Sequence, residues 1–98
     1  AGADLVLVGR DEATLDAAAR ELAMLGRWVG LIVADVGEPD MAAAVCDQAI
    51  ALGRPIDVLV NNVGGRRVDH ATETFPLDEW KRLFDLNLTS ALVCCQTL

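Results

Sequence analysis

The 98-residue sequence predicts an α/β fold that forms part of a doubly wound parallel sheet. Three short apolar runs rich in β-branched residues alternate with stretches whose apolar residues recur at helical spacing. The connections are a few residues long, and the order strand, helix, strand, helix, strand, loop, helix is typical of right-handed crossovers between parallel strands. Such sheets bind ligands beyond the carboxyl ends of their strands, so the residues at these ends are the candidates for a functional site.

The first strand is predicted over residues 5–8, a run of four apolar residues that Gly9 ends. Because the run is apolar on both faces, it fits a sheet that helices cover on either side. Asp11 suits the N-cap of a helix that extends to about Leu25, with one apolar stripe facing the sheet. Gly26 follows as a C-cap glycine.

The remaining elements follow the same pattern. The second strand lies within residues 28–36, and the second helix spans about residues 40–52. The third strand covers residues 56–60 and runs into two asparagines and two glycines. A polar loop over residues 66–76 leads to a last helix, from residue 77 to about 98. This helix is apolar almost all round, which indicates cover on several sides.

The composition excludes several classes of partner and site. The net charge is −7 and the pI about 4.4, whereas nucleic acids and anionic membranes favour clustered Lys and Arg. No apolar run approaches the ~18 residues of a membrane span. Cys46, Cys94 and Cys95 have neither Cys-x-x-Cys spacing nor a nearby histidine. We therefore expect buried free thiols in a reducing cytoplasm, and no disulfide framework or zinc site.

Polar residues end the first two predicted strands, and each has two interpretations. Arg10, after Gly9, offers a fork of donors to the 2′-phosphate of a nucleotide, or is a solvated surface residue that pairs with Asp11 or Glu12. Asp35 accepts a hydrogen bond from an adenine amino group, with Val36 against the base, or caps the turn that follows.

The third predicted strand ends in Asn61 and Asn62, whose amides can reach a sugar hydroxyl or form an ordinary turn. Gly64 and Gly65 permit positive φ and close approach of the backbone to a ligand. In the last helix, Asn87 is a polar residue among apolar neighbours. It either bonds an adjacent loop or marks a local bend whose free carbonyl holds an active-site water.

Residues outside the strand ends carry weaker functional signals. Arg66 and Arg67 contact an anionic substrate or are solvated, and His70 is expected at the surface. Trp28 and Trp80 are expected to pack within the fold.

Four motifs together resemble the short-chain dehydrogenase/reductase family in order and spacing. They are Leu-Val-Leu-Val-Gly-Arg at residues 5–10, Asp-Val at 35–36, Ile-Asp-Val-Leu-Val-Asn-Asn-Val-Gly at 56–64, and Trp80 with Asn-Leu at 87–88. The family pattern at the third motif is Asn-Asn-Ala-Gly, and Val63 replaces the alanine. The resemblance covers essentially the whole chain.

The resemblance implies an NAD(P)(H)-dependent oxidoreductase that transfers a hydride between the nicotinamide and an alcohol or carbonyl substrate. Asn87 corresponds to a residue of the family's catalytic tetrad, while Asn61 supports the sheet. Gly9 and Arg10 favour NADP(H) over NAD(H). The implied cofactor-binding residues are Gly9, Arg10, Asp35, Val36, Asn62, Val63 and Gly64. No metal site is implied.

The resemblance also implies that residues 1–98 are part of an NAD(P)-binding Rossmann-fold domain. The family's glycine-rich turn, catalytic Ser and Tyr-x-x-x-Lys pair are absent from these residues. We therefore interpret the chain as an internal fragment without the first βα unit and the catalytic half, and inactive alone. The sub-family resembles sugar or polyol dehydrogenases (gluconate or glucose type), or 3-oxoacyl-[acyl-carrier-protein] reductases. The parent protein is expected to be a homodimer or homotetramer.

Two other functions remain open, a non-catalytic nucleotide-binding or interaction module on the same fold and a signalling receiver domain. A structural expectation follows from the strand order of doubly wound sheets, in which the missing first strand separates the first and third strands present here. The fragment is expected either to leave a gap one strand wide or to move its third strand into the vacancy.

Overall fold

The computed structural model describes residues 2–65 and 69–98, so the prediction for Arg66 and Arg67 falls outside the described residues. The main elements are β1 (Leu5–Gly9), α1 (Glu12–Ala23), β2 (Val29–Val33), α2 (Pro39–Ala51), α3 (Leu77–Phe84) and α4 (Ser90–Thr97). A short 3₁₀ turn spans Thr72–Thr74, and a π-helical turn, Asp85–Thr89, joins α3 to α4.

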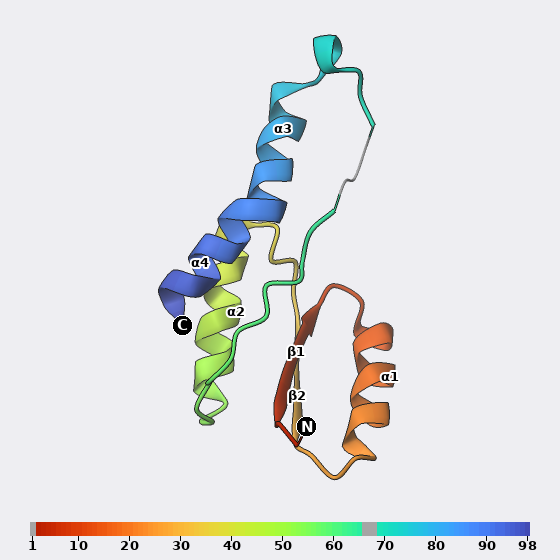
Figure 1. Ribbon diagram of the computed structural model, residues 1–98, viewed down its shortest axis with the longest axis vertical. Helices are drawn as coiled ribbons and strands as arrows, with labels where there is room; N and C mark the ends of the chain where they lie inside the picture. Colours follow the sequence, from red (N-terminus) through yellow and green to blue (C-terminus); the bar gives the residue numbers. More distant parts are fainter. Residues whose placement is uncertain (1, 66–68) are drawn as a thin grey trace.

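The two strands of the sheet are parallel, as predicted. Leu5 pairs with Val29, and the register continues to Gly9 opposite Val33. Helix α1 makes the crossover between the strands and lies on one side of them, while α2 and α4 lie on the other (Figure 1). Asp11 caps α1 as predicted, because its Oδ1 accepts a hydrogen bond of 3.0 Å from the backbone N–H of Thr14. The fold is therefore a partial, Rossmann-like α/β domain.

Residues 56–60 correct the prediction of a third strand. They run in the same direction as β1 (Figure 1), but the sheet formed by the described residues contains only β1 and β2. Val58 and Val60 are each 77% exposed. A segment with strand-like residues forms ladder hydrogen bonds only when a neighbouring backbone lies ~4.8 Å away. Of the two expected outcomes, the structure has the open gap.

The core lies between the sheet and helices α2 and α4. Its buried members are Ile32, Val36, Ala42, Val45, Cys46, Ala49 and Cys94. Cys46 is 2% exposed, and its thiol forms a hydrogen bond with that of Cys94. All three cysteines are free, but Cys95 is exposed, which corrects the expectation that every thiol is buried. Successive residues of a helix point about 100° apart, so Cys94 and Cys95 cannot face the same neighbour.

Ionic and aromatic contacts join the amino ends of the strands. Asp4 accepts hydrogen bonds from Nη1 of Arg54 at 2.6 Å and from the backbone N–H of Trp28 at 3.2 Å. Nη2 of Arg27 lies 3.3 Å from the same carboxylate. The guanidinium of Arg54 also lies 4.4 Å from the centre of the Trp28 ring. Asp4 therefore holds the start of residues 54–60 near the start of β1.

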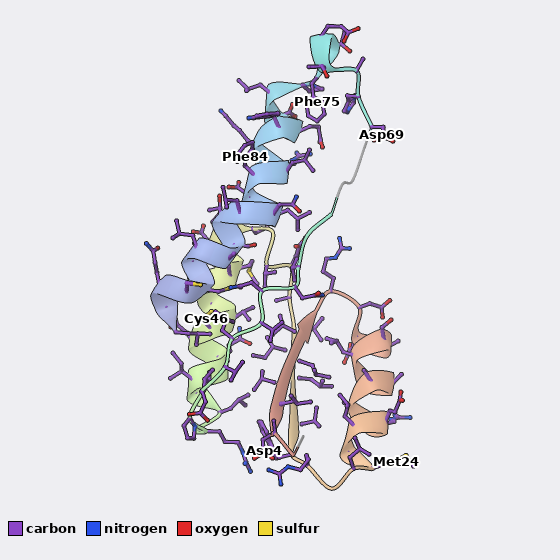
Figure 2. All side chains as sticks on the ribbon, in the orientation of Figure 1. Asp4, Met24, Cys46, Asp69, Phe75 and Phe84 are labelled. Carbon is purple, nitrogen blue, oxygen red and sulfur yellow. The ribbon has the colours of Figure 1, made fainter. Side chains whose placement is uncertain are left out.

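The helix that follows the loop is less covered than predicted. Leu77, Trp80 and Phe84 are exposed on α3, although Trp80 makes ring contacts with Phe75 and Phe84. Phe75, just before α3, and Phe84, its last residue, lie on the part of the chain that extends away from the sheet (Figure 2). Within the described residues, no helix is long and apolar enough to cross a membrane. The same residues contain no group of three or more His, Cys, Asp or Glu placed to hold a metal ion.

Candidate functional site

A groove with a cavity volume of about 330 Å³ lies at the carboxyl ends of β1 and β2. Its lining residues are Val8, Gly9, Arg10, Ala34, Asp35, Val36, Asn62, Val63, Gly64, Gly65 and Leu86. All seven residues predicted to contact a cofactor are in this set, although they come from three separate stretches of sequence. The volume falls in the range of small-molecule sites, ~300–1,000 Å³. The fold thus gathers the predicted residues into one concave surface.

Gly9 and Arg10 form the part of the groove that follows β1. A Cβ atom added at Gly9 would lie 3.3 Å from Cδ2 of Leu15, so a larger residue would press against α1. Arg10 is exposed and also borders a second hollow with Asp11 and Thr14 at the start of α1. In the described part of the chain, no ion pair joins Arg10 to Asp11 or to Glu12. The guanidinium is therefore available at the mouth of the groove.

Asp35 and Val36 follow β2. Oδ1 of Asp35 accepts a hydrogen bond of 2.9 Å from the backbone N–H of Gly37. Asp35 therefore caps the turn that follows β2, which is one of the two interpretations expected from the sequence. The carboxylate lines the groove as well, and Val36 is buried beside it. The turn fixes the direction of the carboxylate, so the two interpretations of Asp35 are compatible.

The wall formed by residues 62–65 is tied to the helix that follows the loop. Oδ1 of Asn87 accepts from the backbone N–H of Gly65 at 2.7 Å, and Nδ2 of Asn87 donates to the carbonyl of Gly65 at 2.9 Å. Gly65 has a φ of +137°, which favours glycine. A Cβ atom added at Gly64 would lie 2.9 Å from Oδ1 of Asn87. The two glycines thus allow the side chain of Asn87 to hold this wall.

Asn87 lies in the π turn, where the helix departs from regular geometry. Its Nδ2 also donates to the carbonyl of Leu83 at 2.9 Å, four residues earlier. Asn87 therefore bonds an adjacent loop, as one of the two interpretations expected, and the helix is irregular around it. The other interpretation, a free carbonyl that holds an active-site water, stays a prediction. Such π turns occur frequently at functional sites. Asn87 does not line the groove but contacts a residue that does.

Sequence reasoning missed Leu86, which is 7% exposed and completes the apolar side of the groove. The only feature of the sequence that could have identified Leu86 as a groove residue is its position next to Asn87. Asn61, expected to support the sheet, lies outside the lining, and its Nδ2 donates to Sγ of Cys95 at 3.5 Å. Among the described lining residues, Arg10 is the one cation and Asp35 the one anion. The groove therefore combines apolar walls with one charge of each sign.

Comparisons with known proteins identify the chain's relatives. The galactitol 2-dehydrogenase (L-tagatose-forming) of Cereibacter sphaeroides is 37% identical over 87 residues, which are 89% of this chain and 33% of that protein. A 3-alpha-(or 20-beta)-hydroxysteroid dehydrogenase of Mycobacterium tuberculosis is 38% identical over 77 residues, 79% of this chain and 28% of the relative. The chain spans about a third of the length of the curated relatives it matches.

Solved structures and a family model agree with these relatives. The L-sorbose reductase of Gluconobacter frateurii, complexed with NADPH and L-sorbose, superposes with a TM-score of 0.89 at 28% identity. The match covers 99% of this chain and 37% of the reductase. The model of the short chain dehydrogenase family matches residues 1–98. The chain belongs to the short-chain dehydrogenase/reductase family of oxidoreductases.

Proposed function

We propose that the chain forms the nucleotide-facing part of an NAD(P)(H)-dependent oxidoreductase that acts on an alcohol or carbonyl group. The groove at the strand ends carries this proposal, because it brings together the seven residues expected to contact a cofactor. The reductase solved with NADPH supports it. When bound, the reduced nicotinamide would supply a hydride to a carbonyl, and the oxidised nicotinamide would accept one from an alcohol.

The groove has the features that an adenosine needs. The Asp35 carboxylate would accept the adenine amino group, and Val36 and Leu86 would cover the faces of the base. The backbone of residues 62–64 would follow the ribose, and Gly64 has no Cβ atom to displace the Asn87 side chain that holds this wall. Asn87 would act in the catalytic machinery and, through Gly65, would hold the ribose wall in place.

Arg10 is proposed to give NADP(H) an advantage over NAD(H). Adenosine 2′,5′-bisphosphate is expected to bind the chain about tenfold more tightly than 5′-AMP, because hydrogen bonds between charged groups are worth ~1.5–3 kcal/mol. Titration calorimetry with both nucleotides measures the difference. R10Q should abolish it without changing the affinity for 5′-AMP.

R20Q is the matched control, since Arg20 lies on the exposed face of α1 and pairs with Asp16. It should leave both affinities unchanged. Equal affinities of the unaltered chain for the two nucleotides would contradict the NADP(H) preference.

The substrate is proposed to be a sugar or polyol, with a 3-oxoacyl thioester as the second candidate. The galactitol dehydrogenase and the sorbose reductase support the first choice, while the hydroxysteroid dehydrogenase is as similar to this chain. Oxidation of NADPH by the longer protein with keto-sugars, 3-oxoacyl thioesters and steroid ketones distinguishes the three. Cofactor binding without turnover would favour the non-catalytic module. The isolated 98 residues, which contain no tyrosine, are expected to be inactive.

The parent protein is proposed to be a cytoplasmic homodimer or homotetramer that associates through the last helix. Exposed apolar residues follow one another along it: Leu77, Trp80, Phe84, Leu88 and Leu92. Burying them against a second copy would remove a large apolar surface from water. Analytical ultracentrifugation of the longer protein with and without F84E tests this, and a monomer in both cases would contradict it.

A further inference from the structure

Among the described residues, Ser90 is the one polar residue that is buried, at 5% exposed. It follows the π turn Asp85–Thr89 directly and begins α4. A buried hydroxyl costs free energy unless it forms a hydrogen bond. Oγ of Ser90 donates to the carbonyl of Leu86, four residues earlier, at 2.8 Å. The buried hydroxyl is therefore bonded to the π turn itself.

The backbone and the side chain of Ser90 bond two successive carbonyl groups. In an α-helix, the N–H of residue 90 would donate to the carbonyl of residue 86. Here the N–H of Ser90 donates to the carbonyl of Asp85, five residues earlier, which is the bond of a π turn. The hydroxyl bonds the carbonyl of Leu86 in place of the N–H. The side chain thus keeps the Leu86 carbonyl bonded while the N–H stays with Asp85.

The carbonyl that Ser90 bonds belongs to the peptide unit between Leu86 and Asn87. A peptide unit is planar, so a bond to this carbonyl also fixes the direction in which the backbone enters Asn87. Leu86 lines the groove, and the side chain of Asn87 bonds the N–H and the carbonyl of Gly65. Both contributions of the π turn to the groove therefore depend on the peptide unit that Ser90 holds.

We propose that Ser90 is a positioning residue for the groove. Its hydroxyl stabilises the π turn, and the turn places Leu86 in the lining and Asn87 against Gly65. Ser90 is not among the lining residues, so it acts through these neighbours. The effect on nucleotide binding rests on the function proposed above, whereas the effect on the turn does not.

Thr97 provides a matched control, because it makes the same kind of bond at the far end of α4. Its Oγ1 donates to the carbonyl of Val93, also four residues earlier, at 2.8 Å. T97V removes this bond away from the π turn and the groove. It should therefore leave the turn, Gly65 and the nucleotide affinity unchanged.

Nuclear magnetic resonance on the 98-residue chain tests the proposal directly. Couplings across hydrogen bonds identify the carbonyl that accepts the N–H of residue 90, which should be that of Asp85 in the unaltered chain. In S90A the coupling should move to Leu86, because the hydroxyl no longer bonds this carbonyl. Amide exchange at Gly65 should accelerate about fivefold, the factor that corresponds to one hydrogen bond. Adenosine 2′,5′-bisphosphate should bind about fivefold more weakly.

Two further variants separate the hydroxyl from the size of the side chain. S90T keeps the hydroxyl and should retain both the coupling to Asp85 and the exchange rate at Gly65. S90C has a side chain of similar size whose thiol is a weaker donor. It should change the coupling and the exchange in the same direction as S90A but by a smaller factor, and it replaces S90A if that variant does not fold.

Three results would overturn the role of Ser90. They are a coupling to Leu86 in the unaltered chain, an unchanged coupling and exchange rate in S90A, and the same changes in T97V as in S90A. The couplings and the exchange require no nucleotide. If the unaltered chain does not bind the bisphosphate, but S90A still shifts the coupling and accelerates the exchange, the proposed function fails and the role of Ser90 is supported.

Discussion

Replacing Asn87 with alanine is expected to weaken binding of adenosine 2′,5′-bisphosphate about tenfold. The side chain makes three hydrogen bonds, two to the backbone of Gly65 and one to the carbonyl of Leu83. At ~0.5–1.5 kcal/mol each, two lost bonds correspond to about tenfold in affinity if the wall must be reordered on binding. Amide exchange at Gly65 should accelerate by a similar factor, which nuclear magnetic resonance can measure.

The neighbouring residue provides a control for this prediction. L88A alters an exposed side chain in the same π turn and should change neither the affinity nor the exchange at Gly65. G64A offers an independent route to the same effect, because its Cβ atom would displace Oδ1 of Asn87. If N87A leaves both the affinity and the exchange rate unaltered, Asn87 does not hold the groove wall.

A rise in pH from 9 to 11 is expected to lower the free energy of unfolding by about 2–3 kcal/mol through Cys46. Burial, followed by the hydrogen bond with Cys94, raises the pKa of the Cys46 thiol from 9.0 to about 11. Between these values the unfolded chain has lost this proton while the folded chain keeps it. Stability therefore falls as the pH rises, by ~1.4 kcal/mol per unit, and is fully retained below pH 9.

Urea unfolding followed by tryptophan fluorescence measures this dependence. C46A should flatten the curve between pH 9 and 11, whereas C95A, which removes an exposed thiol, should keep the slope. The chain has no tyrosine and a single lysine, so few other side chains titrate in this interval. Parallel pH profiles for C46A and the unaltered chain would contradict the assignment.

Local sequence patterns predicted the elements that depend on local interactions. Strand β1 follows from its apolar run, and the start of α1 follows from the cap at Asp11. The groove could also be predicted, because parallel strands bring their carboxyl ends to one edge. The contribution of Asp35 was left open, since a turn cap and a ligand contact use the same carboxylate.

Features that depend on contacts between residues far apart in the chain could not be predicted from the sequence. Residues 56–60 have the composition of a strand, but pairing requires a second backbone at the right distance, which no local pattern reports. The position of Leu86 depends on the irregular turn around it, because a period of 3.6 residues fails where the helix changes geometry. The bonds from Asn87 to Gly65 span 22 residues and were predicted only as bonds to an adjacent loop.

The π turn between α3 and α4 also acts as a phase shift in the helix. It contains one more residue than an α-helical turn, so everything beyond it is rotated by about 100°. Asn87, within the turn, faces the loop at Gly65, and the rotation beyond the turn brings Cys94 to Cys46 in the core. Deleting one residue from Asp85–Thr89 would leave the rest of the helix unchanged, but Asn87 and Cys94 would no longer face Gly65 and Cys46 at the same time. The continuous helix can therefore contact both the groove wall and the core only if it keeps its present number of residues.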